Sequence, residues 1–328
     1  MRGAAEFRGI TFSKFKKTDV VKELFNSLIH SRIEPACYWS AELICAGHYG
    51  DIWETIILFY SKHIHTGNPK VAIYLELRIN NFRDLVNNGF KNEELRLRNN
   101  SRIRRLFCEI MCVLCDAKRR HSFDNIKILK DAMPMKAPTN DISLLKDDPD
   151  ELLIPLNEIS YNINSKNCLG ACHWIEWILE LKNKSCERRM YNVEPKLQMD
   201  IIWPLWDLFV LEAAKNTNKL VPKVVASLLT LFTLKYSTGC VRRRKYLLYF
   251  AVSLLCDGIN VDEDILRDKT IVTNILQNID LVYEQIKKNE ITPNTEYLFK
   301  DVKTYNLEKT IEKLETMNSF GETFMPRI

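Results

Sequence analysis

Apolar residues recur at intervals of three and four along most of the chain, and strict alternation of apolar and polar residues is rare. This spacing gathers apolar side chains on one face of a helix, so it predicts an all-α protein. Helix-start signals agree, because Thr18-Asp19 precedes the first stretch and Asn68-Pro69 precedes the fourth. The clearest predicted helices are residues 20–30, 52–64, 102–117, 151–163, 223–236 and 262–288.

Short strings in the first half of the chain return in the same order in the second half. Four landmarks in one order favour two tandem five-helix bundles that arose by duplication, on a cyclin-like or other helical-repeat plan. The pairs are ACYW (36–39) and ACHW (171–174), DIW (51–53) and DIIW (200–203), PKV (69–71 and 222–224), and CD (115–116 and 256–257).

The segment between the two copies carries three prolines and little helical periodicity, which is typical of a linker. A further helical stretch and a polar end follow the second copy. We therefore predict an N-terminal helical repeat (1–117), a linker (118–149), a C-terminal helical repeat (150–257) and a C-terminal helical extension with a tail (258–328).

Composition narrows the class of protein without naming a function. With 46% hydrophobic residues the chain can bury a core, which excludes a disordered protein. A net charge of +5 is too small to indicate a nucleic-acid binder by itself. The apolar runs are too short for a membrane span, and the N-terminal residues lack a secretory apolar segment. Most of the ten cysteines lie in apolar helical runs, which favours reduced thiols in a cytosol or nucleus.

Some cysteines and histidines stand at spacings that could hold a metal ion. Structural zinc sites place C-x-x-C pairs on turns, whereas these cysteines lie within continuous helical stretches, so we interpret them as core residues. No catalytic, nucleotide-binding or metalloprotease motif occurs, and we expect a non-enzymatic protein without metal or cofactor. The groups considered are Cys108, Cys112, Cys115 and His121, and Cys168, Cys172 and His173. His63 and His65 form a third group, which we interpret as histidines whose charge complements the dipole at a helix C-terminus.

The tryptophans fall at equivalent places in the two halves. Large aromatic residues at repeated helical positions are more often wedges between core helices than a stacking surface for a ligand. We therefore predict a structural role for all six: Trp39, Trp53, Trp174, Trp177, Trp203 and Trp206.

Basic residues crowd the start of the last predicted helix in each half. Cations at a helix N-terminus oppose the helix dipole, so helix capping does not explain them. A phosphate or carboxylate of a partner would explain them, and the alternative is pairing with the acidic neighbours Glu93, Glu94 and Glu187. The predicted anion-binding or partner-binding residues are Arg102, Arg104, Arg105, Arg242, Arg243, Arg244 and Lys245.

Several long strings resemble an uncharacterised protein family of nucleocytoplasmic large DNA viruses, in the algal-virus, mimivirus and marseillevirus groups. The resemblance covers residues 8–258 and implies a viral setting, in the virion or in the viral factory of the host cytoplasm. It supplies no catalytic residues. The strings are PACYWSAELICAGHYGDIWE (35–54), HIHTGNPKVAIYLELRINNF (63–82), LRNNSRIRRLF (97–107), ACHWIEWILE (171–180) and RRRKYLLYFAVSLL (242–255).

The leading hypothesis is a non-enzymatic structural or assembly protein, or a minor capsid-type virion component, that acts on other viral proteins through protein–protein surfaces. The alternative is a nucleic-acid-associated accessory factor in viral transcription or replication, with the arginine clusters as phosphate contacts. A third reading is an adaptor that binds a helix of another protein in a groove between the repeats. The sequence leaves the oligomeric state open.

Overall fold

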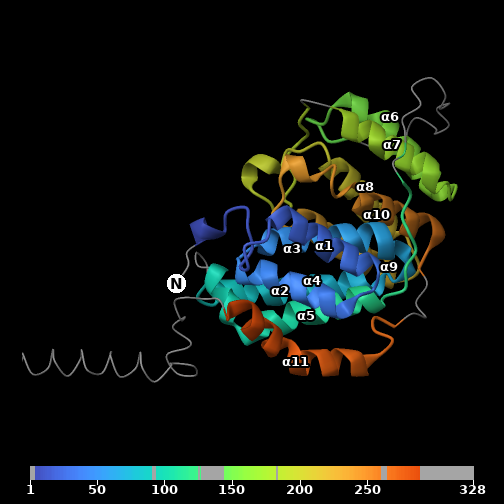
Figure 1. Ribbon diagram of the computed structural model, residues 1–328. Helices are drawn as coiled ribbons and strands as arrows, with labels where there is room; N and C mark the ends of the chain where they lie inside the picture. The colour runs from blue at the N-terminus through green and yellow to red at the C-terminus, as the bar shows by residue number, and fades with distance from the viewer. Residues whose placement is uncertain are drawn as a thin grey trace, which may run out of the picture.

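The computed structural model describes residues 4–90, 94–124, 126, 144–181, 184–259 and 264–288 (Figure 1). These residues form eleven α-helices joined by turns and short 3₁₀ or π segments, with no β-strand among them. The predicted all-α fold class is confirmed. Within the same residues, no helix is both long enough and apolar enough to cross a bilayer.

Five helices lie in each predicted repeat, and one more follows them. Trp39 in α2 and Trp174 in α7 stand at the same distance from the first residue of their 13-residue helices. Internal duplication stays a prediction. The helices are α1 (Lys17–Ile29), α2 (Ile33–Cys45), α3 (Tyr49–Phe59), α4 (Lys70–Asn87), α5 (Ser101–Asp116), α6 (Leu153–Asn164), α7 (Cys168–Glu180), α8 (Trp203–Ala214), α9 (Leu220–Thr233), α10 (Lys245–Asp257) and α11 (Lys269–Lys287).

Local side chains explain where several helices begin. The Asn100 side chain accepts a hydrogen bond from the Arg102 amide (2.9 Å) and caps α5. In the same way, Asp268 accepts from the Thr270 amide (2.8 Å), so α11 begins after Asp268 rather than at residue 262 as the periodicity predicted. The predicted helix 52–64 is also divided, because α3 ends at Phe59 and a π turn, Tyr60–Ile64, follows it.

One hydrophobic core runs through both halves of the chain. α2 packs against α5 and α6 against α7, whereas α4 of the first half packs along α9 of the second. In Figure 1, α6 and α7 lie at one end of the molecule, and α11 lies at the other end against α2 and α5. α11 therefore packs on the first half, although it follows the second half in the chain.

Polar side chains join the two halves where α4 meets α9. The Glu76 carboxylate accepts hydrogen bonds from the hydroxyls of Ser227 (2.6 Å) and Thr230 (2.8 Å). These bonds fix the relative position of the two helices, because a carboxylate with two donors is costly to separate from them.

The first residues of the predicted linker are held against the first half. The backbone amides of Arg120 and Ser122 donate to the carbonyls of Ile64 (3.1 Å) and Lys62 (2.8 Å). Gly67 lies directly beneath this segment, where an added Cβ would stand 2.6 Å from the Lys118 carbonyl oxygen. Residues 125 and 127–143 of the linker, and 289–328 of the predicted extension and tail, lie outside the described residues.

Candidate functional site

A hollow of about 1070 Å³ lies between helices of the two halves, and we call it the groove. One wall comes from α1, α3 and α4, and the other comes from the segment that joins α9 to α10 and from the first two residues of α10. Its floor is apolar and aromatic, with side chains that are buried or partly buried. The floor residues are Val21, Phe25, Trp53, Ile57, Leu58, Phe82, Val86, Leu234 and Tyr246.

The rim of the groove is basic. Two carboxylates also line it, and both already have cationic partners: Asp51 lies 3.1 Å from the Lys17 ammonium, and Glu54 pairs with Arg244. The groove therefore carries a positive excess around an apolar floor. Its cationic residues are Lys22, Lys62, Arg83, Lys235, Arg242, Arg243, Arg244 and Lys245.

The arginines of the turn before α10 differ in their exposure to solvent. Arg242 and Arg243 are exposed, whereas the Arg244 side chain is buried. The Arg244 guanidinium donates to the Phe232 carbonyl (2.6 Å) and pairs with the Glu54 carboxylate of α3. Arg244 thus ties α3, α9 and α10 together, while Arg242 and Arg243 are exposed at the rim and can reach a ligand.

The predicted basic residues do not act as two uniform clusters. Lys245 lies 2.7 Å from the Glu176 carboxylate. Arg104 lies 3.1 Å from the Asp280 carboxylate of α11. Arg104, Arg244 and Lys245 are therefore each paired with a carboxylate from a distant part of the sequence. Arg102, Arg105, Arg242 and Arg243 remain exposed.

The two basic clusters also line different pockets. Arg102 and Arg105 border a smaller polar pocket of about 410 Å³ between α4 and α5. α4 separates this pocket from the groove, because residues 82, 83, 86 and 87 line the groove while residues 78, 81, 85 and 88 line the other side. Of the predicted basic residues that remain exposed, Arg242 and Arg243 are the two that stand beside an apolar floor.

The tryptophans lie mainly in the core. Trp203 and Trp206 are fully buried, and the Trp203 indole donates to the Leu197 carbonyl (2.7 Å). Trp174 is also buried, while Trp39 and Trp177 are partly buried against the core. Of the six, Trp53 is the one that lines the groove.

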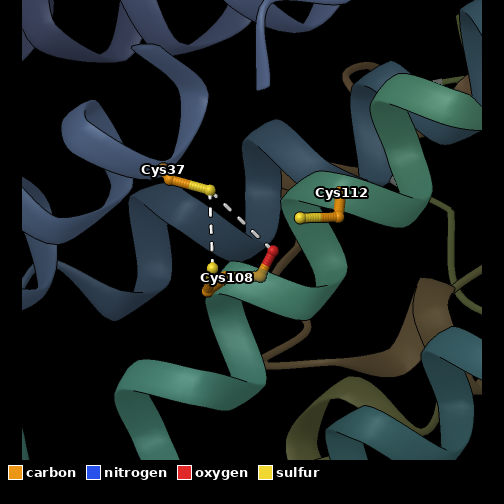
Figure 2. Close-up of side chains that lie close together, drawn as sticks. All are labelled: Cys37, Cys108 and Cys112. Carbon is orange, nitrogen blue, oxygen red and sulfur yellow. Dashed lines mark hydrogen bonds between the residues drawn. The ribbon is translucent and has the colours of Figure 1, made fainter. Parts of the chain in front are cut away.

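The structure brings together a cysteine group that sequence reasoning did not assemble. Cys37 of α2 meets Cys108 and Cys112 of α5, and the three Sγ atoms lie within 4.8 Å of one another (Figure 2). We call these residues the cysteine triad. Cys115 and His121, which the sequence had grouped with Cys108, are not part of it. The i, i+4 spacing of Cys108 and Cys112 was visible in the sequence, but nothing in the sequence pointed to Cys37.

The thiols of the cysteine triad are close enough to change one another's pKa values. Hydrogen bonds from Cys108 and Cys37 hold the pKa of the Cys112 thiol well below its ordinary value. The same contacts, together with burial, raise the pKa of Cys37. The three thiols therefore shift the pKa values of Cys112 and Cys37 in opposite directions, down for Cys112 and up for Cys37.

Among the described residues, the other candidate metal ligands do not converge in a group of three. The His63 and His121 Nδ1 atoms lie 3.1 Å apart, and burial, followed by the charge of His121, lowers the pKa of His63 to about 4. His65 is buried and stacks on Phe250 (4.7 Å between ring centroids). Cys168 lies 3.8 Å from an oxygen of Asp257.

Comparison with protein-family models, curated proteins and solved structures finds no match to this chain. The resemblance to the viral family therefore stays a prediction, and the function has to be argued from the groove and its residues.

Proposed function

We propose that the protein is a non-enzymatic binding module that acts through protein–protein surfaces, with the groove as its main binding site. The observation that carries this proposal is the combination of an apolar floor with a basic rim. A partner suited to both parts is an acidic amphipathic helix, with apolar side chains at i, i+3, i+4 and i+7 and carboxylates on its flanks.

The size and chemistry of the groove favour a peptide over a small molecule. Its volume of about 1070 Å³ lies at the upper end of the roughly 300–1,000 Å³ that small-molecule pockets span. The apolar floor supplies area to bury, and the exposed Arg242 and Arg243 supply charge complementarity at the edge. In the viral setting that the sequence resemblance implies, the occupant would be a segment of another viral protein during assembly or in the virion.

The second candidate is a nucleic-acid-associated accessory factor in viral transcription or replication. The basic rim supports it, because exposed arginines and lysines also bind phosphate. The floor favours the first proposal, since contacts to a phosphate backbone make little use of the partly exposed apolar side chains of Phe25, Leu58 and Val86.

A binding assay with defined probes separates the two candidates. We would measure fluorescence anisotropy with three labelled probes: a synthetic Leu/Glu amphipathic helix, its Leu/Lys counterpart and a single-stranded oligonucleotide. We expect the Leu/Glu peptide to bind best, and the double variant R242E/R243E to weaken that binding at least about tenfold.

The matched control is R102E/R105E, which reverses the same number of charges on the far side of α4 and should leave peptide affinity unchanged within about twofold. Equal binding of the acidic and basic peptides, or an R242E/R243E variant with unaltered affinity, would overturn the peptide proposal. Tight oligonucleotide binding that falls steeply with salt, without peptide binding, would favour the nucleic-acid candidate instead.

A further inference from the structure

The cysteine triad is a cluster of three thiol sulfur atoms in a buried part of the core. Cys37, Cys108 and Cys112 are each at most 2% exposed. The Cys37 and Cys108 sulfurs lie 3.6 Å apart, and all three sulfurs fall within 4.8 Å of one another. Figure 2 shows Cys37 projecting from its helix toward the helix that carries the other two. No histidine or carboxylate among the described residues completes this group.

The spacing of the sulfurs suits one shared metal ion. A metal–sulfur bond of about 2.3 Å places three sulfurs around one ion about 4 Å apart, which is close to the separations seen here. A disulfide needs two sulfurs at about 2.05 Å and would leave the third thiol unused. Three thiols that already converge therefore need only small side-chain rotations to become ligands.

We infer that the cysteine triad is a binding site for a soft, thiophilic metal ion of coordination number three, for which Cu(I) is the matching ion. Thiolate ligands select soft ions, whereas structural zinc almost always takes four ligands in a tetrahedron. Binding forms metal–sulfur bonds and breaks the S–H bond of each thiol that becomes a thiolate. The protons leave to solvent, and the ion keeps its oxidation state.

A bound ion would join α2 to α5, two helices that pack directly against each other. It would thus add a cross-link within the first half, and this role does not depend on what the groove binds. Because the ligands come from residues 37, 108 and 112, the ion would bind the folded chain far better than the unfolded one and would raise its stability.

The test is an anaerobic titration of the reduced full-length protein with Cu(I), supplied as its acetonitrile complex and competed with bicinchoninate. Copper is added both to the folded protein and during refolding, because the site is buried. We expect one tightly held Cu(I) per chain, and a loss of affinity of at least about 100-fold in C37A, C108A or C112A. The matched controls are C45A on α2 and C115A on α5, which remove buried cysteines of the same helices outside the triad and should bind copper normally.

Two measurements on the unaltered protein keep the inference testable if a triad variant fails to fold. X-ray absorption at the copper edge should show three sulfur neighbours. Bound copper should also slow the alkylation of Cys37, Cys108 and Cys112 more than it slows the alkylation of the other cysteines. A chain that retains no copper, a C37A variant that binds it as tightly as the unaltered protein, or a first shell with nitrogen or oxygen would overturn the assignment. Tighter binding of zinc with a fourth ligand would overturn it as well.

Discussion

The basic runs that begin α5 and α10 look alike in the sequence, and in the structure they share two features. Each contains one arginine that turns inward to a carboxylate from a distant helix: Arg104 to Asp280 of α11, and Arg244 to Glu54 of α3. Each also leaves two arginines exposed. The inward arginine in each run is a tertiary cross-link, whereas its two exposed neighbours in the run are open to solvent.

The two runs differ in what surrounds their exposed arginines. The pocket that Arg102 and Arg105 line is polar and also contains Asp84 and the Arg78–Glu109 ion pair (3.2 Å). Arg242 and Arg243 instead stand beside a large apolar floor. The two carboxylates that line the same groove already have cationic partners. The exposed arginines of the two runs therefore have different surroundings. Whether they can form part of a binding site depends on the neighbouring surface and not on the basic run alone.

The largest expected effect comes from removing the inward arginine of the α10 run. Arg244→Met leaves Glu54 without its partner and the Phe232 carbonyl without its donor, so the free energy of unfolding should fall by about 3 kcal/mol. Urea denaturation followed by circular dichroism measures this change. The control, R243M, removes an exposed arginine and should change stability by less than about 0.5 kcal/mol. Equal effects of the two substitutions would mean that the inward and outward positions do not differ as described.

A third basic segment, Lys118–Arg120, extends the comparison to pH. Burial, followed by the charge of Arg120, lowers the pKa of His65 to about 3. In the unfolded chain the pKa of His65 is about 6.5. Between this pH and about pH 3, His65 is protonated in the unfolded chain but neutral in the folded one, so the free energy of unfolding falls as the pH falls.

Replacing His65 by Asn, a polar side chain that does not titrate, removes this proton from the balance. Between about pH 5.5 and 4, the variant should lose about 1.4 kcal/mol less stability per pH unit than the unaltered protein. Denaturation midpoints measured across this range provide the test. Parallel pH profiles for the two proteins would show that His65 titrates normally in the folded state.

The inward arginine of the α5 run should matter less than Arg244. Arg104 lies over the Tyr283 ring (4.8 Å), but its partner Asp280 has a side chain that is 45% exposed and can be rehydrated. We expect Arg104→Met to lower the free energy of unfolding by about 2 kcal/mol. Protection of α11 amides from hydrogen exchange should fall together with stability. A loss as large as that of R244M would remove the distinction between the two runs.

The smallest expected effect is that of the exposed arginines on stability. R242E/R243E and R102E/R105E should each shift the free energy of unfolding by less than about 0.5 kcal/mol, because solvent screens exposed charges. Thermal melts of the two variants beside the unaltered protein check this expectation. If R242E/R243E proved strongly destabilising, its effect on peptide binding would no longer report on the groove.

Local sequence patterns predicted the helices well where the signal was local. The apolar spacing located α1, α5, α6 and α9, and Asn68-Pro69 marked the start of α4. The same reasoning joined residues 52–64 into one helix, because periodicity does not register the π turn at Tyr60–Ile64. It also began the last long helix too early, since the cap at Asp268 competes with a continuous apolar pattern.

The groove and the cysteine triad were beyond the reach of such patterns. The Arg244–Glu54 pair joins residues separated by 190 positions, and Cys37 meets Cys108 across 71 positions. The sequence showed that basic and thiol side chains were present, but not which of them would be buried together. Arg242 and Arg244 differ in exposure although one residue separates them, because the turn before α10 faces solvent on one side and α3 on the other.

The order and type of the amino acids determined by themselves that this chain forms helices, because helix formation depends on contacts three and four residues apart. Tertiary packing alone decided which arginines were neutralised, which apolar side chains formed the floor of a groove, and which three cysteines converged. Those outcomes depend on how α4 lies along α9 and how α2 lies on α5. Such packing is set by many side chains at once and leaves no short signature in the chain.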